Sequence, residues 1–385
     1  MKSSDRNVDS MAGTGARPHR RDPRRSPGLF FLHVLLIVVL LAVACATVAV
    51  RTLGEGRAGP AGRAAVVLPE DIRGASASAA GGSDSLGPLS GPPSPPASLD
   101  SALKASGYEV PENASAYAVR VVEGPESRIY EQYEAGGGSL AGDFWPASSI
   151  KVLAALGALD FARSLGYSGG AMVSFDDGGP SRTLRSIYEP AIRDSSNYDY
   201  DLLVRIAGLD RLNGEFLTAR NGFAVTSISR SYSGLEFRES PAMIIEEGDR
   251  RTYVPVRSAE RDPECKAGNC SNLFEMTESV RRIVLSDQLP PEQRFDLHPD
   301  DLETLTGALL ESEGFFADAV TGALGAGARI YSKPGDADGL DCLDVAFVES
   351  RLGKRFLVAA TVPHSSGGCD ALARLAKGVL EIVSA

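Results

Sequence analysis

The most reactive pairing in this sequence is a serine and a lysine at the start of an apolar stretch. Ser148 and Lys151 lie one helical turn apart, so a helix that begins here places both side chains on one face. A lysine buried there loses proton affinity and can accept the hydroxyl proton of Ser148, which makes the serine a nucleophile. The positive end of the helix dipole would stabilise negative charge that develops nearby. An ordinary helix start, with serine as the cap, has the same spacing.

Two further groups supply what such a nucleophile needs. Ser195 and Asn197 interrupt a helical stretch, where a hydroxyl can relay a proton and an amide can bind a substrate carbonyl. Lys333 ends a β-like run and is followed by Gly335 and Asp336. A lysine on an edge strand beside a glycine can present charge and backbone N–H groups to an anionic substrate.

In this order, the three groups resemble the Ser-x-x-Lys, Ser-x-Asn and Lys-Thr-Gly motifs of the class A β-lactamase and penicillin-binding-protein superfamily. The resemblance covers about residues 99–385. It implies an α/β (α+β) fold, in which a five-stranded antiparallel sheet flanked by helices packs on an all-α lobe, with the site between them. The roles it implies are Ser148 as nucleophile, Lys151 as base, Ser195 as proton relay, Asn197 as substrate contact, Lys333 as electrostatic anchor, Gly335 and Asp336 as substrate-binding residues, and the N–H groups of Ser148 and Asp336 as the oxyanion hole.

Two departures from these motifs concern the third group. Pro334 stands in place of the hydroxyl residue of Lys-Thr-Gly, which removes a hydrogen bond to a substrate carboxylate. Proline also donates no backbone hydrogen bond, although an edge strand tolerates it. The chain between Ser195 and Lys333 is longer than is usual, and we attribute the surplus to an insertion of about residues 236–271.

A third departure concerns the loop that carries a glutamate in class A enzymes, where the glutamate activates the deacylating water. Arg230 is similar to the arginine of that loop, and Tyr232 then falls at the position of the glutamate. Glu236 and Glu239 lie nearby, but neither matches residue by residue. Tyrosine is a poor base with a reference pKa near ~10, so slow deacylation is expected.

The elements that must position these groups follow from hydrophobic periodicity and turn signals. Strands near both ends of the domain and helices between them predict one sheet built from the two termini, with an inserted helical lobe. The predicted strands are 117–123, 128–134, 328–332, 344–349 and 356–361, and the predicted helices are 99–106, 150–165, 183–193, 198–207, 273–285, 299–310 and 371–383.

The N-terminal part is predicted to hold a membrane anchor. Residues 1–28 are a basic cytoplasmic tail, and residues 29–50 carry no Asp, Glu, Lys or Arg. At ~1.5 Å per residue this run can form a transmembrane helix across a hydrocarbon core about 30 Å thick. The basic flank places the N-terminus in the cytoplasm and the domain outside a single-pass cell membrane. Cleavage or lipidation at Cys45 are alternatives. Residues 51–98, rich in Ala, Gly, Ser and Pro, predict a disordered linker before domain 99–385.

Charge and cysteine content agree with export. The first 51 residues carry eight basic and three acidic residues, a net +5, and the whole chain carries −11, which leaves −16 for the remainder. Such an acidic domain repels nucleic acid, so no nucleic-acid partner is expected. Two short-range disulfides are predicted in an oxidising compartment, between Cys265 and Cys270 and between Cys342 and Cys369. The cysteine spacings are not zinc-like, so neither a metal nor a cofactor is expected.

The sequence therefore predicts a membrane-anchored serine hydrolase that forms an acyl-enzyme with β-lactams or cell-wall peptide amides. Its partner is then a small-molecule β-lactam or a peptidoglycan peptide, and nothing in the sequence predicts an oligomeric state. The alternative is a non-catalytic or slow-turnover penicillin- or peptidoglycan-binding module, which keeps the cleft and lacks turnover. An enzyme would be labelled at Ser148 by a fluorescent penicillin or a fluorophosphonate, and a binding module would not.

Overall fold

The computed structural model describes residues 96–385, apart from residues 124–127, 141–143, 180, 237, 261–262, 264, 266 and 338. The predicted cytoplasmic tail, the predicted transmembrane helix 29–50 and nearly all of the predicted linker therefore lie outside the described residues. Within the described part of the chain, no helix combines the length and the apolar character that crossing a membrane requires.

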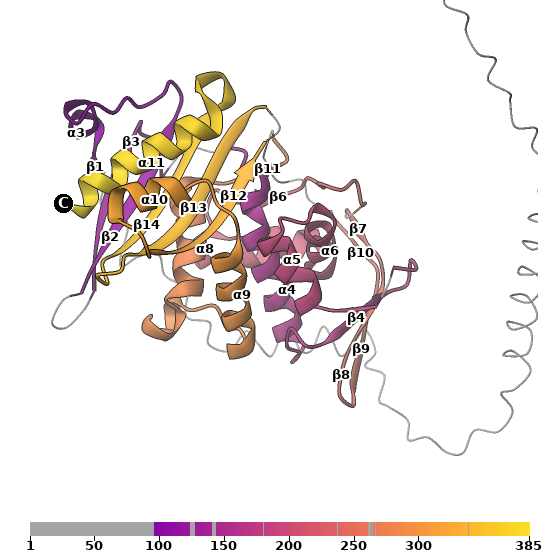
Figure 1. Ribbon diagram of the computed structural model, residues 1–385. Coiled ribbons are helices and arrows are strands. Elements are labelled where there is room, and N and C mark those ends of the chain that lie inside the picture. The colour runs from indigo at the N-terminus through magenta and orange to yellow at the C-terminus, as the bar shows by residue number, and fades with distance from the viewer. Residues whose placement is uncertain are drawn as a thin grey trace, which may run out of the picture. The chain divides into compact units, whose positions relative to one another are not determined.

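The larger sheet joins the two ends of the described chain (Figure 1). In spatial order its strands are β1 (Ala97–Ser98), β3 (Arg128–Ala135), β2 (Ser115–Glu123), β14 (Arg355–Pro363), β13 (Asp341–Glu349) and β12 (Arg329–Asp336). The five long strands are antiparallel, as predicted. The sheet nevertheless has six strands rather than five, because the two-residue β1 adds to β3 in parallel from within the predicted linker.

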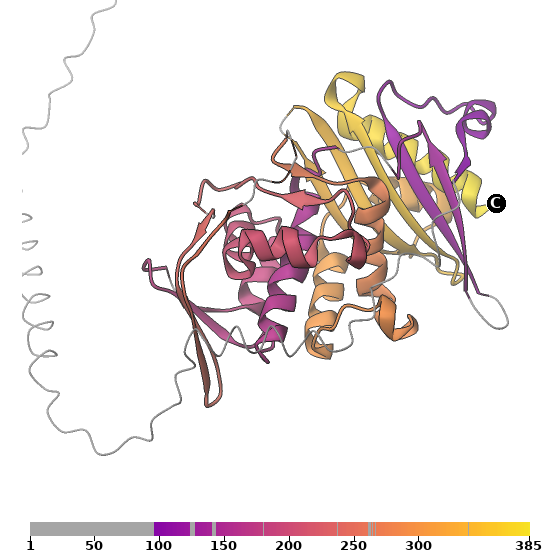
Figure 2. The ribbon, with the colours of Figure 1, turned by 180° about the vertical axis from the view of Figure 1, so that it is seen from behind.

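Side-chain alternation along the strands divides the core between the two faces of this sheet. Phe356 and Val358 of β14 face one way, toward the C-terminal helix α11 (Gly368–Ser384) and α10 (Ala317–Leu324). Leu357 faces the other way, toward α8 (Leu273–Val284) and the helical lobe. Figure 2, from behind, shows α11 crossing the far side of the sheet. The short helix α3 (Asp100–Ala105) packs beside α11 through the buried Leu103.

The helical lobe surrounds α4 (Lys151–Ser164), in which every residue from 151 to 159 is buried. A helix that is apolar on all sides belongs in the middle of a lobe. Helices α5 (Arg185–Arg193) and α6 (Asn197–Ala207) pack against it, and α9 (Pro299–Glu311) packs on α5; all three are close to their predicted ranges. The short connecting helices are η1 (Ala147–Ile150), α7 (Leu209–Arg211), η2 (Leu212–Phe216), η3 (Ala219–Asn221), η4 (Ser286–Gln288), η5 (Pro291–Gln293) and η6 (His364–Ser366).

The prediction of an all-α lobe is wrong, because this lobe also carries a four-stranded sheet. Its order is β5 (Arg182–Thr183), β4 (Met172–Phe175), β8 (Met243–Glu247) and β9 (Arg250–Val254). The predicted insertion 236–271 supplies β8 and β9 as a hairpin. Gly248, with φ of 60°, allows its tight turn, and β8 then finds a partner in β4. Two smaller pairs are β7 (Glu239–Ser240) with β10 (Arg257–Ser258) and β6 (Ser227–Ile228) with β11 (Asn269–Cys270).

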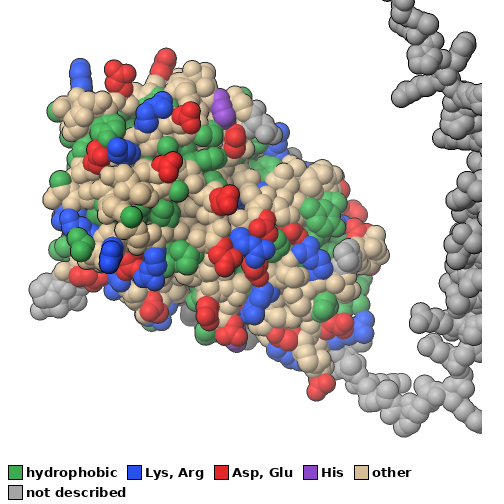
Figure 3. Space-filling view, in the orientation of Figure 1, with side chains coloured by type: hydrophobic (Ala, Val, Ile, Leu, Met, Phe, Trp, Pro, Cys, Tyr) green, Lys and Arg blue, Asp and Glu red, His purple; other side chains and the backbone are tan. Residues whose placement is uncertain are grey.

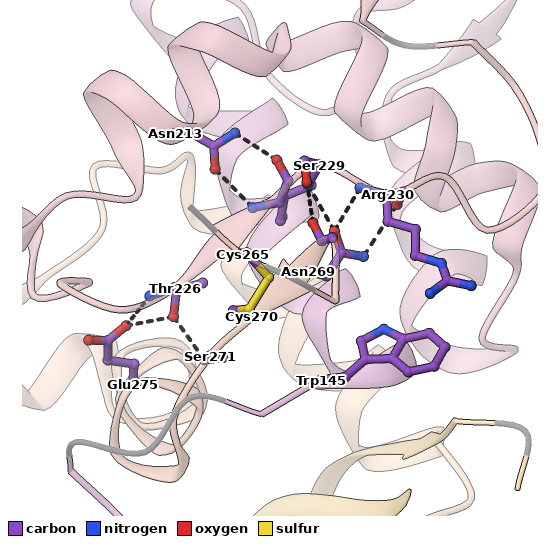
Figure 4. The surroundings of a disulfide bond; sticks show 12 residues. Trp145, Asn213, Thr226, Ser229, Arg230, Cys265, Asn269, Cys270, Ser271 and Glu275 are labelled. Atoms are coloured by element: carbon purple, nitrogen blue, oxygen red, sulfur yellow. Dashed lines mark hydrogen bonds between the residues drawn. A yellow bond between two sulfur atoms is a disulfide. The ribbon is translucent and has the colours of Figure 1, made fainter. Parts of the chain in front are cut away.

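Buried polar side chains hold residues 224–233, here named the Tyr232 loop. Glu275, only 3% exposed, accepts hydrogen bonds from the backbone N–H groups of residues 224–226 at 2.8–2.9 Å. Asn213 exchanges two hydrogen bonds with the main chain of Ile228, at 2.7 and 2.8 Å (Figure 4). A loop that crosses the protein interior needs such partners, because unpaired buried backbone groups are costly.

The second half of the Tyr232 loop has two more anchors. Asn269 Oδ1 accepts the N–H groups of residues 229 and 230, at 2.9 and 3.0 Å. The fully buried Asp201 accepts the N–H groups of residues 232 and 233, at 2.9 and 2.8 Å. The loop is therefore fixed along its whole length by side chains from four separate elements.

Both predicted disulfides form. Cys265 and Cys270, with Cα atoms 5.9 Å apart, close the segment that pairs β11 with β6, beside the Tyr232 loop. Cys342 and Cys369, with Cα atoms 5.1 Å apart, join β13 to the first turn of α11. The first crosslink thus closes a short loop within the insertion, next to the β11–β6 pairing, and the second joins the C-terminal helix to the sheet.

Removing the Glu275 carboxylate should destabilise the domain through the Tyr232 loop. Glu275→Ala leaves several buried N–H donors without an acceptor, and we expect the free energy of unfolding to fall by about 3 kcal/mol. Urea denaturation measures this. Glu303→Ala, at an exposed position of α9, is the control and should change stability by no more than about 0.5 kcal/mol. Equal denaturation midpoints for the two variants would contradict the anchoring role.

Candidate active site

The predicted nucleophile lies on a strained turn ahead of the central helix. Ser148 is half-buried in the 3-10 helix η1, which leads directly into α4. The residue before it, Ala147, has φ of 43°, a left-handed conformation that non-glycine residues rarely adopt. Such strain persists where surrounding contacts enforce it, and it is common at functional sites.

The end of β12 provides those contacts. Ser149 Oγ donates a hydrogen bond of 2.9 Å to the backbone carbonyl of Lys333. At Gly335, an added Cβ would lie 2.8 Å from the carbonyl oxygen of Pro146 and 3.1 Å from Cβ of Ala147. Glycine is therefore needed for this close approach, which brings the strand against the turn that carries the serine.

Lys151 is fully buried and points into the turn between α5 and α6. Its Nζ donates to the carbonyl oxygen of Ser195 at 2.5 Å, to Ser195 Oγ at 3.2 Å and to Asn197 Oδ1 at 2.6 Å. Burial, together with the neighbouring Lys333 ammonium, lowers the pKa of Lys151 to about 7, although Asp201 and Asp199 oppose the shift. A substantial fraction of this lysine is then a neutral amine near pH 7.

Lys333 reaches the same hydroxyl from the other lobe. Its Nζ donates to Ser195 Oγ at 2.9 Å and to the carbonyl oxygen of Pro334 at 3.1 Å. It too is fully buried, and burial lowers the pKa of Lys333 to about 8. The hydroxyl of Ser195 thus lies between two lysines from different lobes, where it can pass a proton from one to the other.

The turn between α5 and α6 is shaped to present these groups. Ser195 has φ of 55°, and Ser196 caps α6 by accepting the N–H of Asp199 at 3.2 Å. Asn197 begins α6 and is exposed. Lys151 Nζ donates to the amide oxygen of Asn197, and the amide nitrogen is left with no partner among the described residues. That nitrogen is available to a substrate carbonyl.

The structure brings together Ser148, Lys151, Ser195, Asn197, Lys333 and Gly335 at the junction of the two lobes. The Ser148 hydroxyl makes no hydrogen bond to any other described residue, and such contacts often tighten only when substrate is bound. Asp336 follows Gly335, but its carboxylate turns to His364 Nε2, at 2.9 Å. Only its backbone N–H remains as a candidate oxyanion donor.

One side-chain group has the composition of a metal site. Ligand atoms of Asp336, Cys342, His364 and Cys369 lie within 4.8 Å of one another. Both cysteine sulfurs are joined in the Cys342–Cys369 disulfide, so no thiolate is present to bind a metal ion.

Tyr232 occupies the space behind the nucleophile turn. Its hydroxyl donates to the carbonyl oxygen of Ala147 at 2.7 Å and accepts from Trp145 Nε1 at 3.2 Å. Its ring stacks on Tyr200 with centroids 4.6 Å apart, and Lys151 Nζ lies 5.7 Å from its centroid. Burial raises the pKa of Tyr232 to about 12, so the phenol is neutral at physiological pH.

The carboxylates near this position have other partners or are exposed. Glu236 accepts the N–H of Arg238 at 2.6 Å, and Glu239 is exposed on β7. Among the described residues, no carboxylate is hydrogen-bonded to Ser148, Lys151 or Ser195. The site therefore contains the groups expected for acylation, and Tyr232 in place of a carboxylate base.

Asp344 was missed by the sequence reasoning. It is fully buried on β13, and the N–H of Phe316 donates to it at 3.2 Å. Burial raises the pKa of Asp344 to about 7, and its charge counteracts part of the lowered pKa of Lys333. An acidic residue within the apolar run of β13 was the available signal, since buried carboxylates are rare without a specific partner.

Comparison with solved structures identifies the fold. The described architecture is similar to a TLA-1 extended-spectrum β-lactamase (13% identity, 74% of this chain and 98% of that chain, TM-score 0.51). It is equally similar to PBP-A in an acyl-enzyme complex with penicillin G (17% identity, 76% and 99%, TM-score 0.51). A TLA-3 extended-spectrum β-lactamase gives 14% identity and the same TM-score of 0.51, over 74% and 98% of the chains. No family profile and no curated protein sequence matches the chain.

The pKa of Lys151 predicts how the reactivity of Ser148 depends on pH. A base must be unprotonated to accept a proton, so the labelling rate should rise with pH through about 7 and level off above it. Lys151→Ala should lose the rate and this pH dependence together. The measurement is the second-order rate of fluorophosphonate labelling between pH 5 and 9. A rate that is independent of pH, or a midpoint near the ordinary lysine value of 10.5, would contradict this role of Lys151.

Proposed function

We propose that this chain, whose fold is that of class A β-lactamases and PBP-A, is a serine acyl-transfer enzyme. In this proposal Ser148 attacks the carbonyl carbon of a β-lactam or of a cell-wall peptide amide and forms an acyl-enzyme. The observation that carries the proposal is the meeting of two buried lysines on the hydroxyl of Ser195, directly behind the turn that carries Ser148.

Acylation follows from the protonation states of these groups. Neutral Lys151 accepts the proton of the Ser148 hydroxyl as its oxygen bonds to the carbonyl carbon. The protonated Lys151 then passes a proton through Ser195 to the leaving nitrogen, while Lys333 stabilises the shared hydroxyl electrostatically. The N–H groups of Ser148 and Asp336 stabilise the oxyanion. Asn197 orients the substrate through its amide nitrogen.

Among the described residues, no carboxylate is placed to act as the base for deacylation. A water must be deprotonated beside the ester, and Tyr232, with its raised pKa, remains a neutral phenol that already donates to Ala147. Its ring also occupies space beside the turn that carries the nucleophile. The acyl-enzyme therefore persists, and transfer to an acceptor other than water, or long-lived binding, is favoured over rapid hydrolysis.

A second candidate is a penicillin- or peptidoglycan-binding module without turnover. Pro334 favours it, because the strand residue beside Lys333 offers neither a hydroxyl nor a backbone N–H to an anionic ligand. Covalent labelling distinguishes the two functions, since a binding module leaves Ser148 unmodified.

The proposed location is the extracytoplasmic side of the cell membrane, with residues 29–50 as the anchor. The two disulfides support an oxidising compartment for the domain. The anchor itself rests on the sequence, because residues 29–50 are outside the described part of the chain.

Replacing the nucleophile should abolish covalent labelling without unfolding the protein. Ser148→Ala removes the only oxygen proposed to be acylated, and because this hydroxyl caps no helix and bonds to no other described residue, we expect stability to change by no more than about 1 kcal/mol. Ser101→Ala, at the other Ser-x-x-Lys spacing in the chain, is the matched control and should label as the unmodified protein does. Mass spectrometry of protein treated with a fluorescent penicillin or a fluorophosphonate gives the modified residue. Labelling that survives Ser148→Ala would reject the assignment.

Restoring a carboxylate at position 232 should release the acyl group. With the unmodified domain we expect a penicilloyl-enzyme that persists for minutes or longer. Tyr232→Glu should accelerate deacylation, by about 10²-fold if the carboxylate acts as a general base. Tyr232→Phe keeps the ring without the hydroxyl and is the control. Stopped-flow and steady-state hydrolysis of a chromogenic cephalosporin measure both steps, and rapid sustained turnover by the unmodified domain would contradict the proposed block.

A further inference from the structure

Arg230 is an exposed cation that has no charged partner among the described residues. Its guanidinium carbon lies 4.3 Å from the centre of the Trp145 ring, and Figure 4 shows the two side chains next to each other. Within the described part of the chain, no hydrogen bond or ion pair engages this guanidinium. Arg193, by contrast, pairs with Glu189 at 2.5 Å and with Asp194 at 2.8 Å. Basic side chains are also interspersed with acidic ones over the face drawn in Figure 3.

The position of Arg230 is held by the Tyr232 loop and by the disulfide segment. Its N–H donates to Asn269 Oδ1 at 3.0 Å, and its carbonyl oxygen accepts from the Tyr200 hydroxyl at 3.1 Å. At Gly268, which has φ of 86°, an added Cβ would lie only 2.8 Å from Cβ of Arg230. The Cys265–Cys270 segment therefore packs against the stem of the side chain. A cation fixed in this way loses little conformational entropy when it binds an anion.

Trp145 connects this cation to the nucleophile turn. It precedes Ser148 by three residues, and its Nε1 donates at 3.2 Å to the Tyr232 hydroxyl, which donates at 2.7 Å to the carbonyl oxygen of Ala147. The ring also packs on the apolar cluster of Ala147 and Leu343. The guanidinium thus lies beside a rigid chain of contacts that ends at the residue before the serine.

The two lysines of the site are less well placed than Arg230 to bind an incoming anionic substrate. Lys151 and Lys333 are both fully buried, and both are hydrogen-bonded to Ser195. Pro334 offers no donor beside them. In a chain with a net charge of −11, an anionic substrate needs a local exposed cation. The planar guanidinium suits a carboxylate because it can bind both oxygens at once.

We propose that Arg230, stacked on Trp145, is a substrate-specificity residue that binds a carboxylate group of the acyl substrate. The assignment rests on the proposed acyl-transfer function and narrows its substrate class to amides or esters that carry a free carboxylate. Arg230 takes no part in proton transfer. It acts on binding, so its loss raises KM for anionic substrates and leaves the chemical step at Ser148 unchanged.

Trp145 allows a direct binding test, because it is the only tryptophan in the chain. In the full chain carrying Ser148→Ala, the fluorescence of Trp145 is titrated with N-acetyl-D-alanyl-D-alanine and with the C-terminal amide of the same dipeptide. We expect the carboxylate to bind more tightly than the amide. Adding Arg230→Gln should weaken carboxylate binding by about fivefold and leave the amide unaffected. Arg351→Gln, an equal charge change at an exposed turn of the sheet, should leave both unaffected.

Equal binding of the two ligands, including no binding of either, or equal weakening by Arg351→Gln, would overturn the assignment.

A second measurement separates the role of Arg230 from the proposed acyl-transfer function. With Ser148 intact, Arg230→Gln should be labelled by a neutral fluorophosphonate at the unmodified rate. A reduced rate would indicate that Arg230 only supports the fold of the site, which also overturns the assignment. If the neutral probe fails to label the unmodified protein, the acyl-transfer proposal itself is wrong, and the Trp145 titration still decides whether a carboxylate binds.

Discussion

Two lysine ammonium groups share one serine hydroxyl in the interior of this protein, and the rest of the structure accommodates that constraint. Burying one cation is costly, and a second nearby cation raises the cost. Part of the cost is offset by acceptors: the carbonyl and hydroxyl oxygens of Ser195 and the side-chain oxygen of Asn197 serve Lys151. The rest of the cost lowers the pKa of Lys151 to about 7 and that of Lys333 to about 8. Both lysines can therefore be neutral near physiological pH.

The backbone is strained at two residues that lie beside the proposed catalytic side chains. Ala147 and Ser195 both have positive φ, although neither is glycine. At Ala147 the surrounding contacts hold the turn in place, because Ser149 bonds to β12 and Gly335 permits the strand to approach the turn. Strand β12 of the sheet contacts both places, since it packs against the turn at Ala147 and its Lys333 donates to Ser195 Oγ, so the site depends on the packing of the sheet against the helical lobe.

Buried acidic and amide side chains hold the loop beside the site in place, and they take no part in the proposed reaction. Glu275, Asn269 and Asp201 are saturated by N–H groups of the Tyr232 loop. Each anchor leaves its neighbours little freedom, and together they place an aromatic ring, rather than a carboxylate, behind the nucleophile. The same anchors hold Arg230 at the surface beside Trp145. Turnover and specificity in the proposed function therefore depend on one loop and on the buried groups that hold it.

The sequence alone determined the features that depend on local spacing. Ser148 and Lys151 lie one helical turn apart because they are three residues apart, across the join of η1 and α4, and the predicted strand 356–361 is confirmed as part of β14. Both disulfide pairings were also predicted, because the cysteines are close together in the chain. These features need no knowledge of distant contacts.

Only the tertiary structure decided which distant groups meet. Ser195 and Lys333 are 138 positions apart, and their hydrogen bond depends on how two lobes pack. The second sheet was missed because β4 pairs with a hairpin from the insertion, and each short strand has too weak a pattern to identify a remote partner. The buried Asp344 and the guanidinium of Arg230, which no described acidic residue pairs, were hidden for the same reason. Burial and the absence of a partner are properties of the packed chain, whereas a sequence pattern reports only what neighbouring residues do to one another.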